Sequence, residues 1–158
     1  MLSVLTGSKR KVFAFEPVTK NVFYIKRHLE LNKIVNTTLI EKAVSDTIGI
    51  LKFSLSSNPS QGHLSEEGEI EVETITLDEF IKQGNPYPDL IKMDIEGAEY
   101  LALKGSKEIL KIKKPVIFLA THGYEVREKC LKLLSEFDYK ITSLDNKEIS
   151  KSDEFICY

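Results

Sequence analysis

Hydrophobic positions along the chain form short apolar runs that alternate with segments of helical spacing. The first run, residues 11–15, is nearly continuous and is closed by Glu16 and Pro17, a pattern that predicts a buried parallel strand followed by a turn. Across residues 18–31, apolar side chains recur at helical spacing at Val22, Ile25 and Leu29, which predicts a helix with one buried face. The two segments together predict a β-α unit.

The segment that follows contains further strands and a polar stretch. Residues 38–44 are rich in β-branched side chains and are stopped by Ser45 and Asp46, which predicts a second strand. Residues 50–55 and 70–75 alternate between apolar and polar positions, which predicts two antiparallel strands. We expect the polar, turn-rich stretch between them, residues 58–68, to form a mobile loop.

The rest of the chain alternates strands with helices again. Thr76 and Glu79 have the spacing of a capping box and predict a short helix that ends near residue 83. The remaining predicted elements are strands at 90–93 and 115–120, helices at 98–110 (broken at Gly105) and 124–137, and two short final strands at 139–144 and 154–158 that form an antiparallel edge.

Strands that alternate with helices predict the α/β class, with a mostly parallel sheet, helices on both faces, and ligands beyond the carboxyl ends of the strands. A chain of 158 residues fits one domain, 1–158, because a domain of that size supports its own core. The 22 basic and 24 acidic residues provide no charge excess for a nucleic acid or an anionic membrane. The expected partners are therefore small molecules or proteins.

Cysteine content and hydropathy indicate the compartment. Cys130 and Cys157 are the two cysteines, too few for a disulfide framework and outside any cluster of metal-ligand spacing. We interpret both as core thiols in a reducing compartment. No apolar run approaches the roughly 18 residues of a membrane span, and the apolar start at residues 1–5 is too short for a signal-peptide core. The sequence predicts a soluble, cytoplasmic protein.

Glu16 is the first candidate for function, because it closes the first strand. An acidic side chain there commonly accepts hydrogen bonds from the ribose hydroxyls of a nucleotide. The alternative is a solvated turn residue before Pro17 that favours the start of the next helix. On position alone the two interpretations are equally good.

Asp94, Glu96 and Glu99 follow the apolar strand 90–93 and are the most informative residues of the chain. Two carboxylates immediately after a buried strand repel each other unless a ligand, a metal or a proton compensates, and Gly97 permits a sharp backbone turn there. The alternative is that Glu96 and Glu99 occupy the first turn of the next helix, where negative charge is favourable. That alternative accounts less well for Asp94.

His122 follows the strand 115–120 and precedes Gly123, which places a titratable group at the same ligand edge. A histidine can act as a general base near neutral pH, although a lone histidine at a strand end is more often an ordinary hydrogen-bonding residue. His28 on the first helix and His63 in the polar loop are expected at the surface.

The motifs together closely resemble those of the FkbM-type S-adenosylmethionine-dependent methyltransferases. The central motif is Asp89-Leu90-Ile91-Lys92-Met93-Asp94-Ile95-Glu96-Gly97-Ala98-Glu99. The other matching pieces are residues 12–17, Leu31-Asn32, residues 43–46 with Gly49, residues 76–78, residues 103–105, Leu110, residues 115–117 and residues 121–123. Their order and spacing also fit, so the resemblance covers almost the whole chain.

The resemblance implies a Rossmann-like class I methyltransferase that transfers a methyl group from S-adenosylmethionine to a hydroxyl of a sugar or natural product. Glu16 would bind the ribose hydroxyls, and Ala43, Val44, Ser45 and Asp46 would border the adenine. Asp94 would lie beside the methionine moiety and the acceptor. Glu96 and His122 would orient or deprotonate the acceptor hydroxyl, so the resemblance implies Asp94, Glu96 and His122 as catalytic residues.

One part of the family pattern has no counterpart. Complete members carry an apolar strand and a glycine-rich loop well ahead of the Glu16-Pro17 equivalent, whereas here ten residues, with Gly7 as their one glycine, precede Lys11. A parallel crossover needs about a dozen residues, so residues 1–5 cannot replace that strand. We expect a gap in the middle of the sheet, between the strands at 12–15 and 90–93. Either these strands pair directly, or a partner chain or second copy covers the gap, or the sequence is a truncated gene product.

Two other functions compete with methyl transfer. The first is a degenerate, non-catalytic methyltransferase-like domain that acts as a binding or assembly module, which the missing loop favours. The second is a nicotinamide-dependent oxidoreductase, which shares the argument for Glu16 but needs a glycine-rich turn that is likewise absent.

Overall fold

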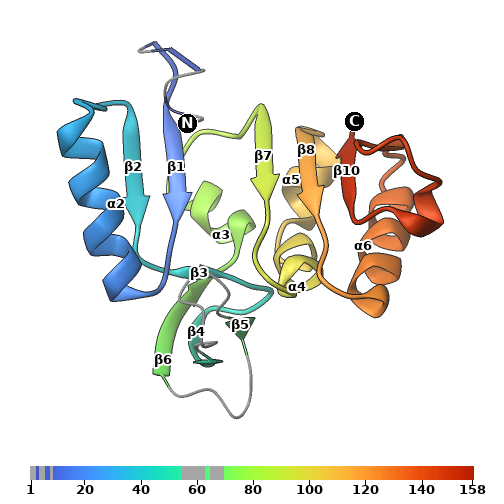
Figure 1. The fold of residues 1–158 in the computed structure, drawn as a ribbon, viewed down its shortest axis with the longest axis horizontal. Helices are drawn as coiled ribbons and strands as arrows, with labels where there is room; N and C mark the ends of the chain where they lie inside the picture. The colour runs from blue at the N-terminus through green and yellow to red at the C-terminus, as the bar shows by residue number, and fades with distance from the viewer. Residues whose placement is uncertain (1–2, 4–5, 8, 55–62, 65–69) are drawn as a thin grey trace.

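The computed structural model describes residues 3, 6–7, 9–54, 63–64 and 70–158. It confirms the α/β class (Figure 1), but the described strand pairs are mixed parallel and antiparallel instead of mostly parallel. The described strands form three sheets, in the orders β1-β2, β3-β6-β4-β5 and β7-β8-β10-β9. The predicted loop 58–68 lies outside the described residues except for β5 (His63–Leu64). None of the described helices is both long and apolar enough to span a membrane.

The first sheet contains the predicted β-α unit. β1 (Val12–Phe15) pairs in parallel with β2 (Thr37–Ile40), and α2 (Thr19–Leu31) connects them. Val22 is buried and Ile25 and Leu29 are partly buried, while the other face of α2 carries the exposed His28. The stripe predicted from helical spacing is therefore confirmed, and so is the surface position of His28.

The single strand predicted at 38–44 is wrong. The segment forms β2 and the short β3 (Ala43–Val44), which belong to different sheets. The chain leaves the first sheet at the polar pair Glu41-Lys42, and Lys42 forms an ion pair with Glu73 of the second sheet, with Nζ and Oε2 2.8 Å apart. β-branched residues favour strands on either side of this pair and do not reveal the break between them.

The second sheet is a small antiparallel excursion below the main body in Figure 1. β4 (Gly49–Ser54) and β6 (Ile70–Ile75) pair antiparallel, as predicted, while β3 pairs in parallel with β6. After β6 comes α3 (Leu77–Lys82), whose N-cap residue Thr76 accepts a hydrogen bond from the Glu79 backbone N–H at 3.0 Å. This contact confirms the Thr76 half of the predicted capping box.

The third sheet holds most of the core. β7 (Leu90–Met93) and β8 (Val116–Ala120) are parallel, and β10 (Glu154–Cys157) is antiparallel to both β8 and β9 (Ile141–Ser143). Both final strands are antiparallel neighbours, as predicted, with β9 at the edge. The short helix η1 (Ile149–Lys151) precedes β10.

Three helices pack on this sheet: α4 (Glu99–Lys104), α5 (Lys107–Ile112) and α6 (Tyr124–Glu136). The core cluster that joins them to the sheet is Met93, Ala102, Leu103, Leu110, Ile117, Leu119, Cys130, Leu133, Leu134, Tyr139, Phe155 and Cys157. β8 alternates between buried and half-buried residues. One face of the sheet therefore packs against the helices while the other is half-buried, instead of both faces being covered as predicted.

Cys130 and Cys157 are free thiols in this core, as predicted. Burial raises the pKa of each thiol to about 12. Both therefore remain protonated and unreactive at physiological pH.

The first and third sheets are separate in the described part of the chain. β1 and β7 face one another in Figure 1, but no strand pairing joins them within the described part of the chain. Phe80 of α3 makes edge-to-face contacts with Phe13 and Phe15 of β1, with ring centroids 5.2 Å apart in both cases. Direct pairing of the two strands, one of the alternatives left open by the sequence, is therefore not what the structure adopts.

The chain between α4 and α5 packs closely against β3 at Gly105. A Cβ atom at Gly105 would lie 2.1 Å from the backbone oxygen of Ser45, at the end of β3, so only glycine fits. The Asp78 carboxylate accepts hydrogen bonds from the backbone N–H groups of Glu108 and Ile109, both at 3.0 Å, and so binds the start of α5. These contacts connect α3 and β3 to the helices of the third sheet.

Candidate functional site

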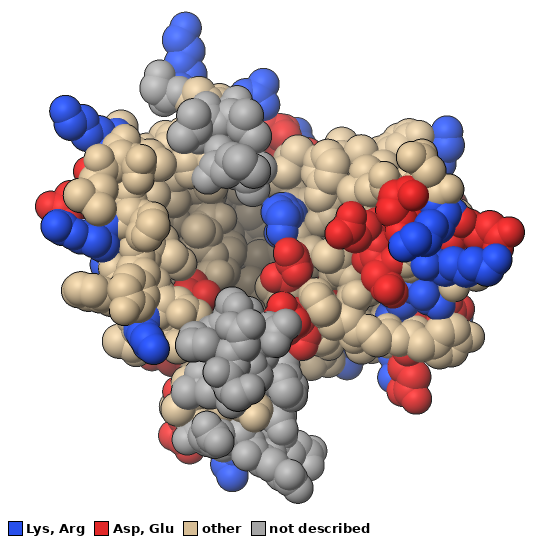
Figure 2. Space-filling model, in the orientation of Figure 1, with Lys and Arg blue, Asp and Glu red and all other residues tan. Residues whose placement is uncertain are grey.

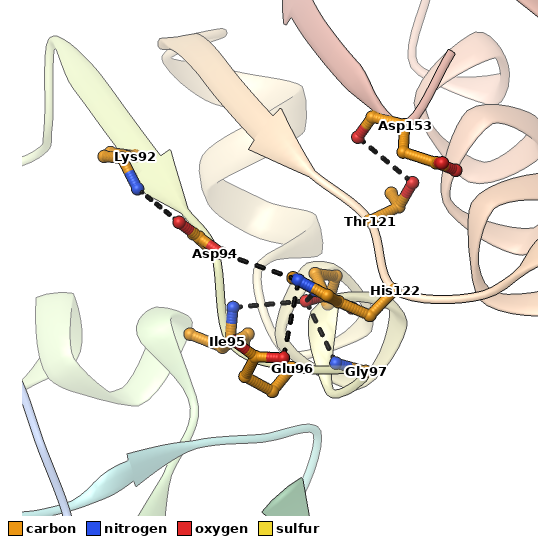
Figure 3. Close-up of polar contacts among 9 residues, drawn as sticks. Lys92, Asp94, Ile95, Glu96, Gly97, Thr121, His122 and Asp153 are labelled. Atoms are coloured by element: carbon orange, nitrogen blue, oxygen red, sulfur yellow. Dashed lines mark hydrogen bonds and ion pairs between the residues drawn. The ribbon is translucent and has the colours of Figure 1, made fainter. Parts of the chain in front are cut away.

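The candidate site lies where β7 and β8 end. Met93 is opposite Leu119 in the parallel register, so the residues that follow each strand emerge at the same edge of the sheet. After Asp94 the chain turns through Glu96, with a φ of +54°, and Gly97, with a φ of +103°. A left-handed φ is uncommon for a non-glycine residue, and here it directs the Glu96 side chain back toward His122 (Figure 3).

His122 lies at the centre of this group (Figure 3). Its Nε2 atom is 3.5 Å from Oε2 of Glu96 and 3.8 Å from Oδ1 of Asp94. Its Nδ1 atom is 2.9 Å from Oε1 of Glu99. The structure thus brings together all three residues predicted to be catalytic and adds a fourth on the opposite side of the imidazole.

Glu99 is fully buried, with 0% of its side chain exposed. Its Oε1 atom also accepts hydrogen bonds from the backbone N–H groups of Ile95 and Gly97, both at 3.1 Å, whereas its buried Oε2 atom has no hydrogen-bond partner within the described chain. Glu99 does occupy the first turn of α4, but its carboxylate is buried and bound to His122 instead of serving only the helix end. Sequence analysis grouped Glu99 with the strand-end carboxylates Asp94 and Glu96 but did not identify it as a partner of His122.

The surroundings of His122 alter its proton affinity. Partial burial lowers the pKa of the imidazole, but the hydrogen bond and charge of Glu99 and the charges of Glu96 and Asp94 outweigh burial and raise the pKa above its ordinary value. The hydrogen bond to Glu99 also favours the tautomer that carries its proton on Nδ1. In the neutral form, Nε2 then presents its lone pair to the acidic side of the site.

Hydrogen bonds hold the side chain of Asp94 and the backbone before His122 in place. Lys92 Nζ donates a hydrogen bond to Oδ2 of Asp94 at 2.9 Å, which leaves Oδ1 as the atom nearer His122. The buried Thr121 backbone N–H and side-chain hydroxyl both donate to the Asp153 carbonyl oxygen, at 2.8 and 3.3 Å. These bonds connect the end of β8 to the start of β10 and hold His122 at the sheet edge.

Glu16 lies at the carboxyl end of β1, as predicted, and is half-buried. Its Oε1 atom accepts a hydrogen bond from the backbone N–H of Val18 at 2.8 Å, just before α2. The turn role considered for Glu16 is thus present in the structure. Within the described chain, no hydrogen bond or ion pair joins Glu16 to the group around His122.

Residues 43–46 lie at β3 and its carboxyl end. Ala43 and Val44 pair with β6, Ser45 is fully buried, and Asp46 forms an ion pair with Lys104 at the end of α4, with Oδ2 and Nζ 2.6 Å apart. Lys104 belongs to the helix that begins at Glu99. The predicted adenine segment is therefore connected to the His122 group through α4 and not by direct contact.

Two surface cavities of the described chain lie away from these residues. One is lined by α3, the start of α5 and Tyr87, and the other by α4 and α6. Figure 2 shows instead a surface hollow between β1 and β7, with acidic groups gathered on its β7 side. Neither cavity is lined by a strand-end carboxylate or histidine, whereas the hollow borders the strand-end acidic groups, so the candidate site lies at the hollow.

Comparisons with known proteins identify the relatives of this chain. The model of the methyltransferase FkbM domain matches residues 1–145. The hexuronic acid methyltransferase AglP of Haloferax volcanii is 32% identical over 151 residues, an alignment that covers 91% of this chain and 62% of that protein. The chain thus spans less than two thirds of the length of this relative.

A solved structure shares the fold. The crystal structure of a methyltransferase FkbM from Methylobacillus flagellatus KT superposes with a TM-score of 0.66 and 18% sequence identity, and the match covers 94% of this chain and 36% of that one. The family match over residues 1–145 and the relative at 32% identity together establish that the chain belongs to the FkbM methyltransferase family.

Proposed function

We propose that the protein transfers a methyl group from S-adenosylmethionine to a hydroxyl of a sugar, with hexuronic acids as the acceptor class. Family membership supports methyl transfer, and the similarity to a hexuronic acid methyltransferase supports the acceptor class. The observation that carries the proposal is the position of His122 Nε2, which lies 3.5 Å from Glu96 and 3.8 Å from Asp94 at the ends of two parallel strands.

The residues at the strand ends fit S-adenosylmethionine chemically. Glu16 is a half-buried carboxylate after β1 and provides acceptors for two ribose hydroxyls. Ala43, Val44, Ser45 and Asp46 would border the adenine, and Asp94 would lie near the methionine part. When bound, this cofactor supplies an electrophilic methyl group on a sulfonium. The chain's own residues then have to position the acceptor oxygen and exclude water.

The His122 group would activate the acceptor. In its neutral form, with Nδ1–H donated to Glu99, His122 can accept the hydroxyl proton at Nε2 as the oxygen forms its bond to carbon. The raised pKa of His122 makes it a stronger base than a free imidazole, and the negative charges of Glu96 and Asp94 stabilise the imidazolium that results. A positioned general base contributes roughly 10²- to 10⁴-fold to a rate.

His122→Gln tests the acceptor role. We expect transfer of a labelled methyl group from S-adenosylmethionine to a hexuronic acid glycoside to fall about 10²-fold or more, with affinity for S-adenosylmethionine unchanged. His28→Gln, on the exposed face of α2, is the control and should retain full activity. Equal activity of the His122 and His28 variants would contradict the assignment.

Glu16→Ala tests the donor role. Calorimetry should show weaker binding of S-adenosylmethionine to this variant, whereas Glu30→Ala, which removes an exposed carboxylate of α2, should bind as the parent does. Unchanged affinity after the Glu16 substitution would leave that residue with its turn role alone.

The alternative function, a non-catalytic binding or assembly module, is favoured by the facing edges of β1 and β7, which pair with no strand among the described residues. We propose that a strand from a partner chain, a second copy or a longer form of this protein completes the sheet between them. Unpaired edge strands are templates for such addition. Light scattering that finds a monomer, together with robust methyl transfer by the purified 158-residue chain, would eliminate both the module and the need for a completing strand.

A further inference from the structure

We propose that Asp94, Glu96 and His122 bind a divalent cation of the Mg²⁺ or Mn²⁺ type. One donor atom from each residue lies within 4.8 Å of the other two. An ion of this type binds its ligands at roughly 2.0–2.2 Å, so ligands of one ion lie about 3 to 4.5 Å apart. The Nε2 separations of 3.5 Å from Glu96 and 3.8 Å from Asp94 already meet this requirement.

The donor set indicates the kind of ion. Two carboxylates and one imidazole favour a hard or borderline cation over the soft metals that need thiolates, and the two cysteines are buried in the core. Asp94, Glu96 and His122 remain partly exposed, by 43, 27 and 36% of their side chains. Further coordination positions are therefore open to water or to a ligand.

The burial of Glu99, which is not one of the three proposed ligands, also favours a cation at this site. Glu99 is a fully buried carboxylate, and within the described chain His122 is its one cationic partner. A buried carboxylate without positive charge nearby is costly. A cation bound to Nε2 of His122 would supply positive charge next to Glu99 through the imidazole. The contact of 2.9 Å between Nδ1 and Oε1 of Glu99 fixes the orientation of the ring. A carboxylate that holds the far nitrogen of a metal-binding histidine is a common second layer of protein metal sites.

A cation would also explain how a negatively charged acceptor can bind beside Asp94 and Glu96. This step rests on the proposed function. A hexuronic acid carries a carboxylate, which Asp94 and Glu96 would repel, and Lys92 is already paired with Asp94 at 2.9 Å. A bound divalent cation offsets the charges of Asp94 and Glu96 and offers a coordination position to that carboxylate or to the neighbouring hydroxyl. His122 is then a ligand and no longer the base. The cation lowers the pKa of the acceptor hydroxyl, and the proton passes to solvent water.

Titration of the chelator-treated protein with Mn²⁺, without cofactor or acceptor, tests the inference. Free Mn²⁺ measured by electron paramagnetic resonance should reveal one site per chain. Asp94→Asn and Glu96→Gln, both at exposed or half-exposed positions that leave folding intact, should abolish it, and Glu99→Gln should weaken it about 10- to 100-fold. Asp138→Asn, a 92% exposed carboxylate elsewhere, is the control and should bind as the parent does.

The outcomes separate this inference from the proposed function. Absence of Mn²⁺ binding, or binding that survives both the Asp94 and the Glu96 substitutions, overturns the metal site even if methyl transfer is observed. A site lost in both variants supports the metal even if no methyl transfer is found. Methyl transfer that is unaffected by chelation would overturn the role of the cation at the acceptor.

Discussion

His122 and Glu99 form a hydrogen-bonded pair in which Nδ1 lies 2.9 Å from the Oε1 atom of a carboxylate with no solvent exposure. The pair spans two elements, because His122 follows β8 and Glu99 opens α4. The orientation of the histidine is therefore decided by the helix packed behind it. Its free nitrogen is presented to Asp94 and Glu96.

Replacing Glu99 by Gln should lower the pKa of His122. The Glu99 hydrogen bond and charge are the largest causes that raise this pKa, and glutamine keeps the size of the side chain without the charge. The NMR titration of the His122 ring in metal-free protein measures the effect. Glu128→Gln, on the exposed side of α6, is the control; if both variants titrate alike, Glu99 does not set the proton affinity of His122.

Protonated His122 should make the stability of the metal-free protein depend on pH. Its pKa is raised above the ordinary histidine value of 6.5, so the folded state binds the proton more tightly than the unfolded state does. The stabilisation is fully present below about pH 6.5 and is lost as the pH rises through the folded pKa. Urea unfolding at a series of pH values should show this decline, and His122→Gln should remove it. An identical pH profile in the variant would contradict the prediction.

Gly105→Ala should destabilise the fold by about 1–3 kcal/mol, the usual cost of overpacking. The new Cβ would lie 2.1 Å from the Ser45 backbone oxygen, and a backbone atom cannot move aside as a flexible side chain can. Chemical denaturation measures the loss of free energy of unfolding. Lys111→Ala, at an exposed position of α5, should change stability little; a similarly small effect at Gly105 would show that β3 can shift away from α4.

Asp78→Ala should cost about 1 kcal/mol, as removal of a helix cap does. The substitution leaves the Glu108 and Ile109 N–H groups at the start of α5 without their 3.0 Å partner. The matched control is Asp89→Ala, which removes a 74% exposed carboxylate from a surface ion pair and is expected to have a much smaller effect. The midpoint of urea unfolding distinguishes the two, and equal midpoints would mean that water replaces the Asp78 cap.

Much of the fold and of the site could be read from local patterns. Asp94, Glu96 and His122 could be expected to lie together because each follows a strand, and the parallel strands β7 and β8 end at the same edge of the sheet. The division of the strand predicted at 38–44 could not be read in the same way. Strand propensity describes how each residue fits a pleated surface and contains no information about which sheet it joins.

The sequence by itself determined the α/β class, the helical faces, the turn at Gly97 and the strand-end position of the acidic motif, since these follow from periodicity and backbone sterics. Tertiary structure alone decided the burial of Glu99, its bond to His122 and the separation of β1 from β7. An acidic residue in a first helical turn is ordinarily solvated. Only the packing of α4 against the sheet makes that carboxylate a buried partner for the histidine.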